Sequence, residues 1–422
     1  MTAPQSLLSR RLVLLLSLTC AAAVGNLYFA QAVTPLAASG LGVSAGAAAL
    51  TVTATQVGYA AGNFLIAPLG DRFPHRTVLT VLLCLTALGL LAAGCAPALP
   101  ALAAASAFVG LTTVAASVVG PLAAGLTAPE RRGEVSGTLL SGSIGGILLS
   151  RTFGGTLAET LGWRAPYLAA AAVMLLLAGV LRAALPSTTP ARAETHTPYL
   201  ALITAPLRFL REEPELRRSC LYQACVFAGF SAVWTCVVLL LTGPVYGMGA
   251  PAAGLLALVG AVTMVATPLA GRVVDRRGPD VVNLVCLLGT IASAGVLTAG
   301  ALGGAVGLSA LVVGTLLLDV AMQCGMVANV TRVYALRDDA RSRLGTAYMT
   351  CAYLGGSAGS WLGARAWDAA GWAGVCGLPA LLTAAALVRH LTASGRHRSG
   401  SVLGEPPAAD GARRGRSGQY HL

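Results

Sequence analysis

The chain is a succession of long apolar segments separated by short polar ones. An α-helix needs about 20 mostly apolar residues to cross a bilayer, and runs of that kind are centred near residues 23, 57, 87, 111, 146, 174, 230, 262, 292, 319, 354 and 381. Backbone groups in lipid must be hydrogen-bonded within a helix or a closed barrel, and these runs are longer than barrel strands. The pattern predicts an all-α membrane protein with twelve transmembrane helices.

One polar pattern occurs twice, each time directly after an apolar run. Asp71 and Arg72 in the first copy correspond to Asp275 and Arg276 in the second. Gly137-Thr138 and Gly162-Trp163 recur in the same order as Gly345-Thr346 and Gly371-Trp372. Ordered repeats of this kind are typical of transporters built from two related halves. We expect six-helix bundles over residues 10–185 and 217–391, a cytoplasmic linker over 186–216, and a disordered basic tail over 392–422.

The basic residues alternate between the two ends of the predicted helices. The chain has 28 of them, all arginine, and about 25 fall at the N-terminus, in every second loop, in the linker or in the tail, which the positive-inside rule places in the cytoplasm. We therefore expect a multi-pass protein of the cytoplasmic membrane with both termini inside. Its net charge of +12 then needs no nucleic-acid partner, and its partner is the lipid bilayer.

Composition excludes a soluble protein. Hydrophobic residues make up 56% of the chain and charged residues 10%, with a mean hydropathy of +0.75. No phosphate-binding loop, metal-spaced histidine or cysteine cluster, or nucleophile with an evident base is present. We expect no cofactor, no metal and no enzymatic activity, and a monomer.

The repeated loop carries a family motif. In the second copy, Gly271, Asp275, Arg276 and Gly278 match the pattern G-x-x-x-D-R-x-G-R, and the first copy keeps Asp71, Arg72 and Arg76 but has Ala67 and Pro74 in place of the glycines. Over residues 10–391 the chain thus resembles the major facilitator superfamily. The resemblance implies a carrier whose two bundles alternate around a central site.

An aspartate at a helix end can accept hydrogen bonds from arginine or from a facing helix N-terminus and so hold the cytoplasmic side shut. The alternative is charge that only sets topology. The predicted gate residues are Asp71, Arg72, Arg76, Gly271, Asp275, Arg276 and Arg332.

Within the superfamily the chain looks most like the proton-coupled branch of drug and sugar exporters, with two departures. The membrane arginine of the fourth helix would fall at Ser106, and the glycine-proline pair of the fifth helix is replaced by Ser150-Arg151. The predicted function is proton-coupled efflux of a small organic molecule. An uptake symporter or uniporter, or a transport-dead membrane sensor or scaffold, remains an alternative.

Arg151 and Asp319 are the candidates for proton coupling. A central arginine costs about 2.5 to 3.5 kcal/mol on insertion scales and needs a partner or a wet cavity. At 1.5 Å per residue, Arg151 and Asp319 lie roughly 24 and 18 Å from the cytoplasmic face, so arginine's length would let them meet. We expect this pair to form and break during transport, which would change the proton affinity of the carboxyl group. A static ion pair is the alternative.

Polar and aromatic residues within the apolar runs are candidates for substrate contact, although such residues more often join helices to one another. The predicted substrate residues are Asn26, Tyr28, Gln31, Gln56, Gln223, Trp234, Gln323 and Tyr348.

Overall fold

The computed structural model describes residues 9–127, 131–185, 199–337 and 340–402, and every element longer than one turn in these ranges is a helix. The first half of the chain contributes α1 (Arg10–Gly25), α2 (Phe29–Leu41), α3 (Ala45–Ala48), α4 (Leu50–Leu65), α5 (His75–Gly94), α6 (Leu99–Thr112), α7 (Ala115–Leu126), α8 (Arg132–Leu161) and α9 (Ala165–Ala184). A short 3₁₀ turn, η1 (Ala67–Asp71), follows α4.

The second half begins with α10 (Tyr199–Glu212), which is joined to the first half by residues that the structure leaves undescribed. It continues with α11 (Pro214–Thr242), α12 (Pro251–Leu258), α13 (Thr263–Arg277), α14 (Pro279–Thr298), α15 (Gly304–Tyr334) and α16 (Arg341–Val402), with the 3₁₀ turns η3 (Val259–Val262) and η4 (Ala299–Leu302) between them. Helix α16 continues past Thr392, where the tail was predicted to begin, and residues 403–422 lie outside the described part.

The predicted all-α fold with twelve transmembrane helices is confirmed by this arrangement. In the described residues, nine helical spans are long and apolar enough to cross a bilayer. The span Arg341–Thr392 holds two of the predicted helices, because α16 leaves helical geometry at Ala370 and Gly371. The two predicted helices outside the nine spans are α4, with 16 residues, and α8, which is rich in glycine and serine and carries Arg151.

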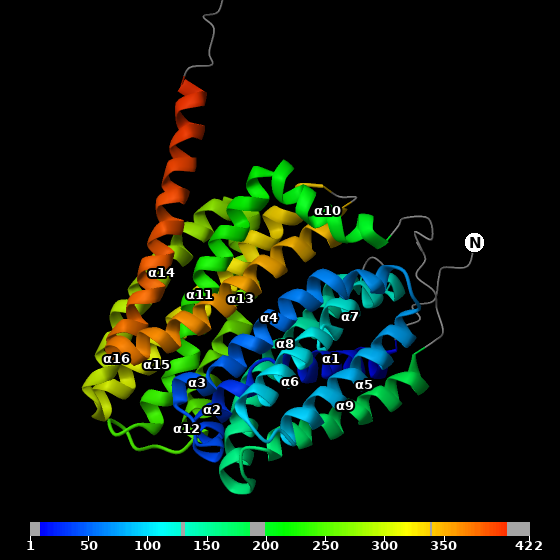
Figure 1. The fold of residues 1–422 in the computed structure, drawn as a ribbon. Coiled ribbons are helices and arrows are strands. Elements are labelled where there is room, and N and C mark those ends of the chain that lie inside the picture. The colour runs from blue at the N-terminus through cyan, green and yellow to red at the C-terminus, as the bar shows by residue number, and fades with distance from the viewer. Residues whose placement is uncertain (1–8, 128–130, 186–198, 338–339, 403–422) are drawn as a thin grey trace, which may run out of the picture.

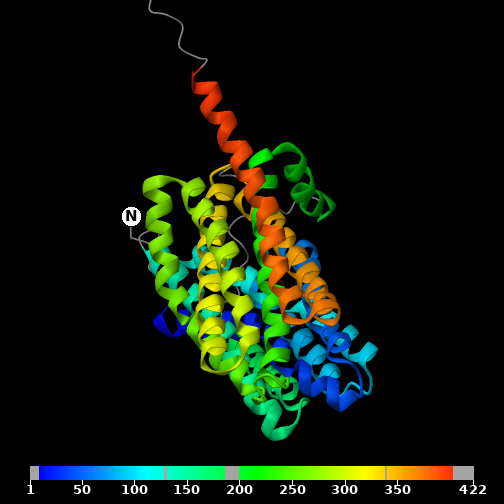
Figure 2. The ribbon, with the colours of Figure 1, turned by 90° about the vertical axis from the view of Figure 1, so that its left-hand side faces the viewer.

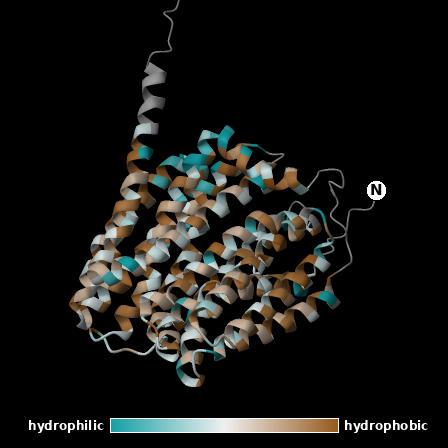
Figure 3. Cartoon of the chain, in the orientation of Figure 1, coloured by the Kyte–Doolittle hydropathy of each residue, from teal (hydrophilic) through white to brown (hydrophobic). Residues whose placement is uncertain are grey.

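The two halves stand side by side as separate groups of helices, blue to green and green to red in Figure 1 and in the turned view of Figure 2. Tyr199 at the start of α10 donates a hydrogen bond to the carbonyl of Leu65 at the end of α4. We call this end of the molecule, which also holds the start of α1, the linker face. Figure 3 shows hydrophilic residues gathered there around α10, whereas apolar colours cover most of the helices.

Small residues let helices within each half approach closely. Gly355, Gly359 and Gly363 of α16 face Ala224, Ala228 and Ala232 of α11, and a Cβ atom at Gly359 would lie 2.0 Å from the carbonyl oxygen of Ala228. Because hydrophobicity alone does not draw helices together in lipid, this spacing of small residues stabilises the bundle through dispersion contacts between the backbones. Gly142 and Gly146 bring α8 against α1 in the same way.

The halves meet one another at the end away from the linker face. Thr152 of α8 donates to the carbonyl of Gly254 of α12 at 3.0 Å, and Thr53 of α4 donates to Ser360 of α16 at 3.2 Å. A Cβ atom at Gly155 would lie 2.9 Å from the carbonyl oxygen of Ala250. These contacts close the space between the halves on this side.

Candidate functional site

A cavity of about 390 Å³ lies between the halves. Its lining includes Gly70 in η1, His75 at the start of α5, Tyr334 at the end of α15 and Ser342 at the start of α16, so the cavity reaches the linker face. Its volume falls within the range of small-molecule pockets. Because the halves touch at the opposite end, the cavity extends into the molecule from one side.

Aromatic rings form the deep end of the cavity, which we call the aromatic floor: Tyr28, Tyr59, Phe227 and Tyr353. The ring centroids of Tyr59 and Tyr353 lie 4.3 Å apart, and those of Phe227 and Tyr353 lie 5.1 Å apart, both in edge-to-face geometry. This geometry is the favoured one for aromatic pairs. Since Tyr59 and Tyr28 belong to the first half and the other two rings to the second, the floor joins the halves.

Polar groups line the cavity next to the floor. Tyr348 donates a hydrogen bond of 2.9 Å to the side-chain oxygen of Gln223, and Ser117 donates one of 2.7 Å to Asn63. Gln323 of α15 lines the cavity, is 8% exposed, and has no hydrogen-bond partner among the described residues. Of the predicted substrate residues, Tyr28, Gln223 and Gln323 line this cavity. Tyr348 is hydrogen-bonded to Gln223 behind the lining.

The two predicted coupling residues lie one helical turn beyond the cavity. On α8 the deepest lining residue is Ile147, and Arg151 lies one turn further from the linker face. On α15 the deepest lining residue is Met322, and Asp319 lies one turn further from the linker face. Arg151 is 2% exposed and Asp319 is 6% exposed. Both charged groups are therefore buried beyond the deep end of the cavity.

Trp234 of α11 separates the two charges. The guanidinium carbon of Arg151 lies 3.9 Å from the centroid of the Trp234 ring, while the indole N–H donates to Asp319 Oδ1 at 2.9 Å. Nε and Nη2 of Arg151 donate to Gln31 Oε1 at 3.1 and 2.8 Å. A cation above an aromatic ring is attracted by its negative face. In this conformation Arg151 and Asp319 are thus joined through Trp234 and do not form an ion pair within 4 Å.

Of the other four predicted substrate residues, Gln31 and Trp234 contact Arg151, and the remaining two hold helices together. Asn26, in the break between α1 and α2, donates to Thr113 at 3.4 Å in the break between α6 and α7. Gln56 of α4 donates to Ser231 of α11 at 2.8 Å and so joins the two halves.

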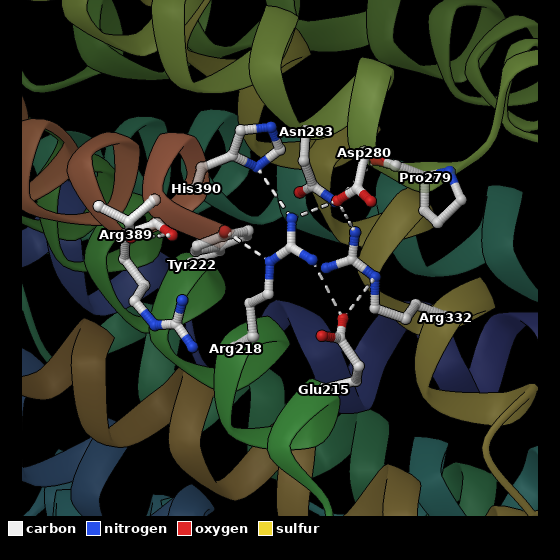
Figure 4. Close-up of polar contacts among 10 residues, drawn as sticks. Glu215, Arg218, Tyr222, Pro279, Asp280, Asn283, Arg332, Arg389 and His390 are labelled. Carbon is white, nitrogen blue, oxygen red and sulfur yellow. Dashed lines mark hydrogen bonds and ion pairs between the residues drawn. The ribbon is translucent and has the colours of Figure 1, made fainter. Parts of the chain in front are cut away.

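A cluster of charged residues, which we call the linker-face cluster, joins the ends of α11, α14 and α15 to α16 (Figure 4). Asp280 at the start of α14 accepts hydrogen bonds from both Arg218 of α11 and Arg332 of α15. Glu215 lies 3.2 Å from Arg218 Nη1 and 3.6 Å from Arg332 Nε. Arg218 also donates to Tyr222 at 2.7 Å and lies 3.4 Å from His390 of α16. Both arginines are buried, whereas the side chains of Asp280 and Glu215 are 50% and 40% exposed.

The remaining predicted gate residues lie apart from this cluster. Arg72, Asp275 and Arg276 are exposed, and no ion pair joins them to another described residue. Arg76 is half-buried, and its Nε has no hydrogen-bond partner in the described part of the chain. Gly271 has open space where a side chain would stand, and the side chain of Asp71 lies outside the described part. Arg332 alone of the predicted gate residues belongs to the cluster.

Several residues of the site were not predicted from the sequence. Tyr59 and Phe227 of the aromatic floor were missed, although each stands one turn from a polar residue of the same helix that was predicted, Gln56 and Gln223 respectively. The acids of the linker-face cluster were missed because each lies at a helix start, where an acid is expected in any case for its interaction with the helix dipole.

The comparisons with known proteins agree with this architecture. The model of the Major Facilitator Superfamily matches residues 14–360. The chain is 36% identical over 376 residues to the uncharacterized transporter YgaY of Escherichia coli O157:H7, covering 89% of this chain and 94% of that protein. It is 32% identical to the probable transporter SCO4007 of Streptomyces coelicolor, with 88% and 85% covered. A chloramphenicol resistance protein of Streptomyces lividans is 31% identical over 277 residues, which are 64% of this chain and 68% of that one.

Solved structures show the same fold at low identity. The nucleoside transporter NupG has a TM-score of 0.72 at 12% identity, covering 90% of this chain and 99% of its own. The peptide transporter POT, in complex with alafosfalin, has a TM-score of 0.68 at 17% identity, with 93% and 96% covered. The resemblance that the loop motifs predicted is confirmed: the chain belongs to the major facilitator superfamily and is a multi-pass membrane transporter of that type.

Proposed function

We propose that this transporter exports a small organic molecule across the cytoplasmic membrane in exchange for protons, by alternating access. The linker face lies in the cytoplasm in this proposal, as the distribution of arginines indicates. The observation that carries it is a cavity that reaches the linker face and ends at an aromatic floor, with Arg151, Trp234 and Asp319 directly behind that floor.

The described conformation supports loading from the cytoplasm. The cavity is accessible from the linker face, while contacts such as Thr152 to Gly254 close the other end. Export requires these contacts to separate and the halves to close at the linker face. Because the floor consists of rings from both halves, the same movement would open the floor toward the outside.

The same movement supports proton exchange at Asp319. Asp319 and Trp234 lie in the second half, whereas Arg151 and Gln31 lie in the first, so rotation of the halves changes the distance between the charges. Since the proton affinity of a carboxyl group depends on nearby charge and on water, Asp319 takes or releases a proton according to the conformation. The chloramphenicol resistance protein among the relatives favours export over uptake.

Proteoliposomes that contain a pH-sensitive dye test the proposal. A substrate gradient is expected to drive a pH change with wild type, and Asp319→Asn should abolish it. The matched control is Glu134→Gln, which neutralises an exposed acid paired with Arg131 and should leave the pH change intact. Full proton-dependent transport by Asp319→Asn would contradict the coupling role.

The assay also separates the alternatives. Substrate flux without any pH change in either protein would indicate a uniporter, with Arg151 and Asp319 as a structural pair. Proton movement in the same direction as the substrate would indicate an uptake symporter.

A further inference from the structure

We infer that the cavity binds an uncharged molecule that carries a planar ring and at least one hydrogen-bonding group. The inference rests on the proposed function and deepens it, because it names the substrate class. Three features of the cavity carry it: the absence of charge on its described walls, the aromatic floor, and an amide group without a partner.

The described walls offer no countercharge to an ion. None of the described residues that line the cavity is an aspartate, glutamate, lysine or arginine, and His75 lies at the linker-face end. A charged ligand would therefore give up its hydration without gaining a partner of opposite charge. A neutral ligand loses much less hydration on entry, so the walls favour it.

The aromatic floor matches a planar ring. Tyr59 and Phe227 both pack edge-to-face on Tyr353, and a ligand ring can extend this array with the same geometry. A cage of rings could also attract a cation. Here the guanidinium of Arg151 lies 5.2 Å from the ring centroid of Tyr28, so this ring already faces a cation. That cation also offsets the charge of Asp319 behind the floor, which leaves no net negative charge there to attract a second cation.

Gln323 supplies the unused hydrogen-bonding group. Its side chain is more than nine-tenths buried, lines the cavity and has no hydrogen-bond partner among the described residues. The amide is therefore available to a ligand in the cavity, and a primary amide both donates and accepts. A ligand with a hydroxyl, amide or carbonyl group satisfies it. The methionines Met322, Met326 and Met349 complete the wall with flexible side chains that adapt to ring substituents.

Ligand binding to the purified full chain in detergent tests the inference through tryptophan fluorescence. The neutral ring probes are chloramphenicol and uridine. The charged probes are chloramphenicol succinate, an anion, and tetraphenylphosphonium, a cation. At least one neutral probe is expected to bind about tenfold or more tightly than both charged probes, because a charged probe gives up its hydration without meeting a countercharge on the described walls. Equal or tighter binding of either charged probe, or no neutral binding at millimolar concentration, would overturn the inference.

Two substitutions at Gln323 test the role of its amide. Gln323→Leu should weaken binding of the neutral probe about tenfold. Gln323→Glu keeps the shape but adds the missing charge, and should shift the preference toward the cation. The exposed Glu134→Gln variant is the control and should bind as wild type does. Unchanged selectivity in Gln323→Glu would count against the inference even if the leucine variant failed to fold.

The proteoliposome assay distinguishes this inference from the proposed function. Charged probes that drive a pH change would leave proton exchange standing and refute the substrate class. Neutral probes that bind in detergent and cross the membrane without a pH change would leave the substrate class standing and refute proton exchange.

Discussion

The linker-face cluster should stabilise the second half of the molecule, and Asp280→Asn removes its central carboxylate. Asp280 accepts hydrogen bonds from two buried arginines, Arg218 and Arg332. Removing one partner of a fully buried ion pair costs about 3 to 5 kcal/mol. The Asp280 side chain is 50% exposed and Glu215 still faces both arginines, so solvent screening reduces the expected loss to about 2 kcal/mol.

Thermal unfolding of the purified protein in detergent measures this loss. If the second half unfolds as a unit of about 200 residues, a loss of about 2 kcal/mol lowers its midpoint by about 4 to 8 °C. The effect should shrink in high salt only slightly, because the arginines are buried. Most of the lost stability comes from the two arginines, because they are buried and water cannot replace the carboxylate as their hydrogen-bond partner.

Asp275→Asn is the matched control. Asp275 is the aspartate of the family motif, lies just before Asp280 in the chain, is exposed, and forms no ion pair with a described residue. Its replacement should change stability by no more than about 0.5 kcal/mol, as for other surface substitutions. Equal shifts of the midpoint in the two variants would refute the assignment of the stabilising role to Asp280.

Three further predictions concern packing, the buried charges and the closed end. Gly359→Ala should destabilise the protein by about 1 to 3 kcal/mol through overpacking, whereas Gly377→Ala, in the same helix but with no atom near its Cβ position, should be nearly neutral in a thermal melt; equal effects would contradict the packing argument. Trp234→Phe keeps a ring but removes the indole N–H, and should change the pH dependence of transport and lower stability by about 1 to 3 kcal/mol, because the buried Asp319 loses its donor; an unaltered pH profile would show that this hydrogen bond plays no part in coupling. A disulfide formed in the double variant Thr53→Cys and Ser360→Cys should lock the closed end and stop transport until it is reduced, whereas either single variant should remain active after the same oxidant; continued transport by the cross-linked protein would show that this end does not open.

Much of the fold follows from the sequence because its determinants are local. Twelve apolar runs and the two loop copies are patterns along the chain, and the helices formed where the runs predicted them. Two helices, α8 and α16, fit the pattern of apolar runs less well than the others. Helix α8 is low in apolar content because its glycines allow close contact with α1, and α16 contains two predicted helices, which are divided where the backbone leaves helical geometry at Ala370 and at Gly371, a glycine with positive φ.

The site was harder to predict because it depends on rotation about helix axes as well as on depth. The depths of Arg151 and Asp319 were estimated from residue counts, but those counts carry no information on which side chain stands between them. Trp234 was predicted as a substrate residue, and the structure places it between the two charges. The contact of Asp280 with Arg218 and Arg332 spans 62 and 52 residues, so no local pattern shows it.

A solitary buried acid has a consequence for the energy that the proposed exchanger can use. Among the described residues, Asp319 is the only buried carboxylate, so one proton would cross for each neutral molecule exported, and each cycle would carry one net charge. Moving one charge through 100 mV is worth about 2.3 kcal/mol. A membrane potential of about 150 mV would then supply about 3.5 kcal/mol, enough to sustain a concentration ratio of about 300 even without a pH gradient. Membrane voltage alone would therefore drive export by the proposed exchanger.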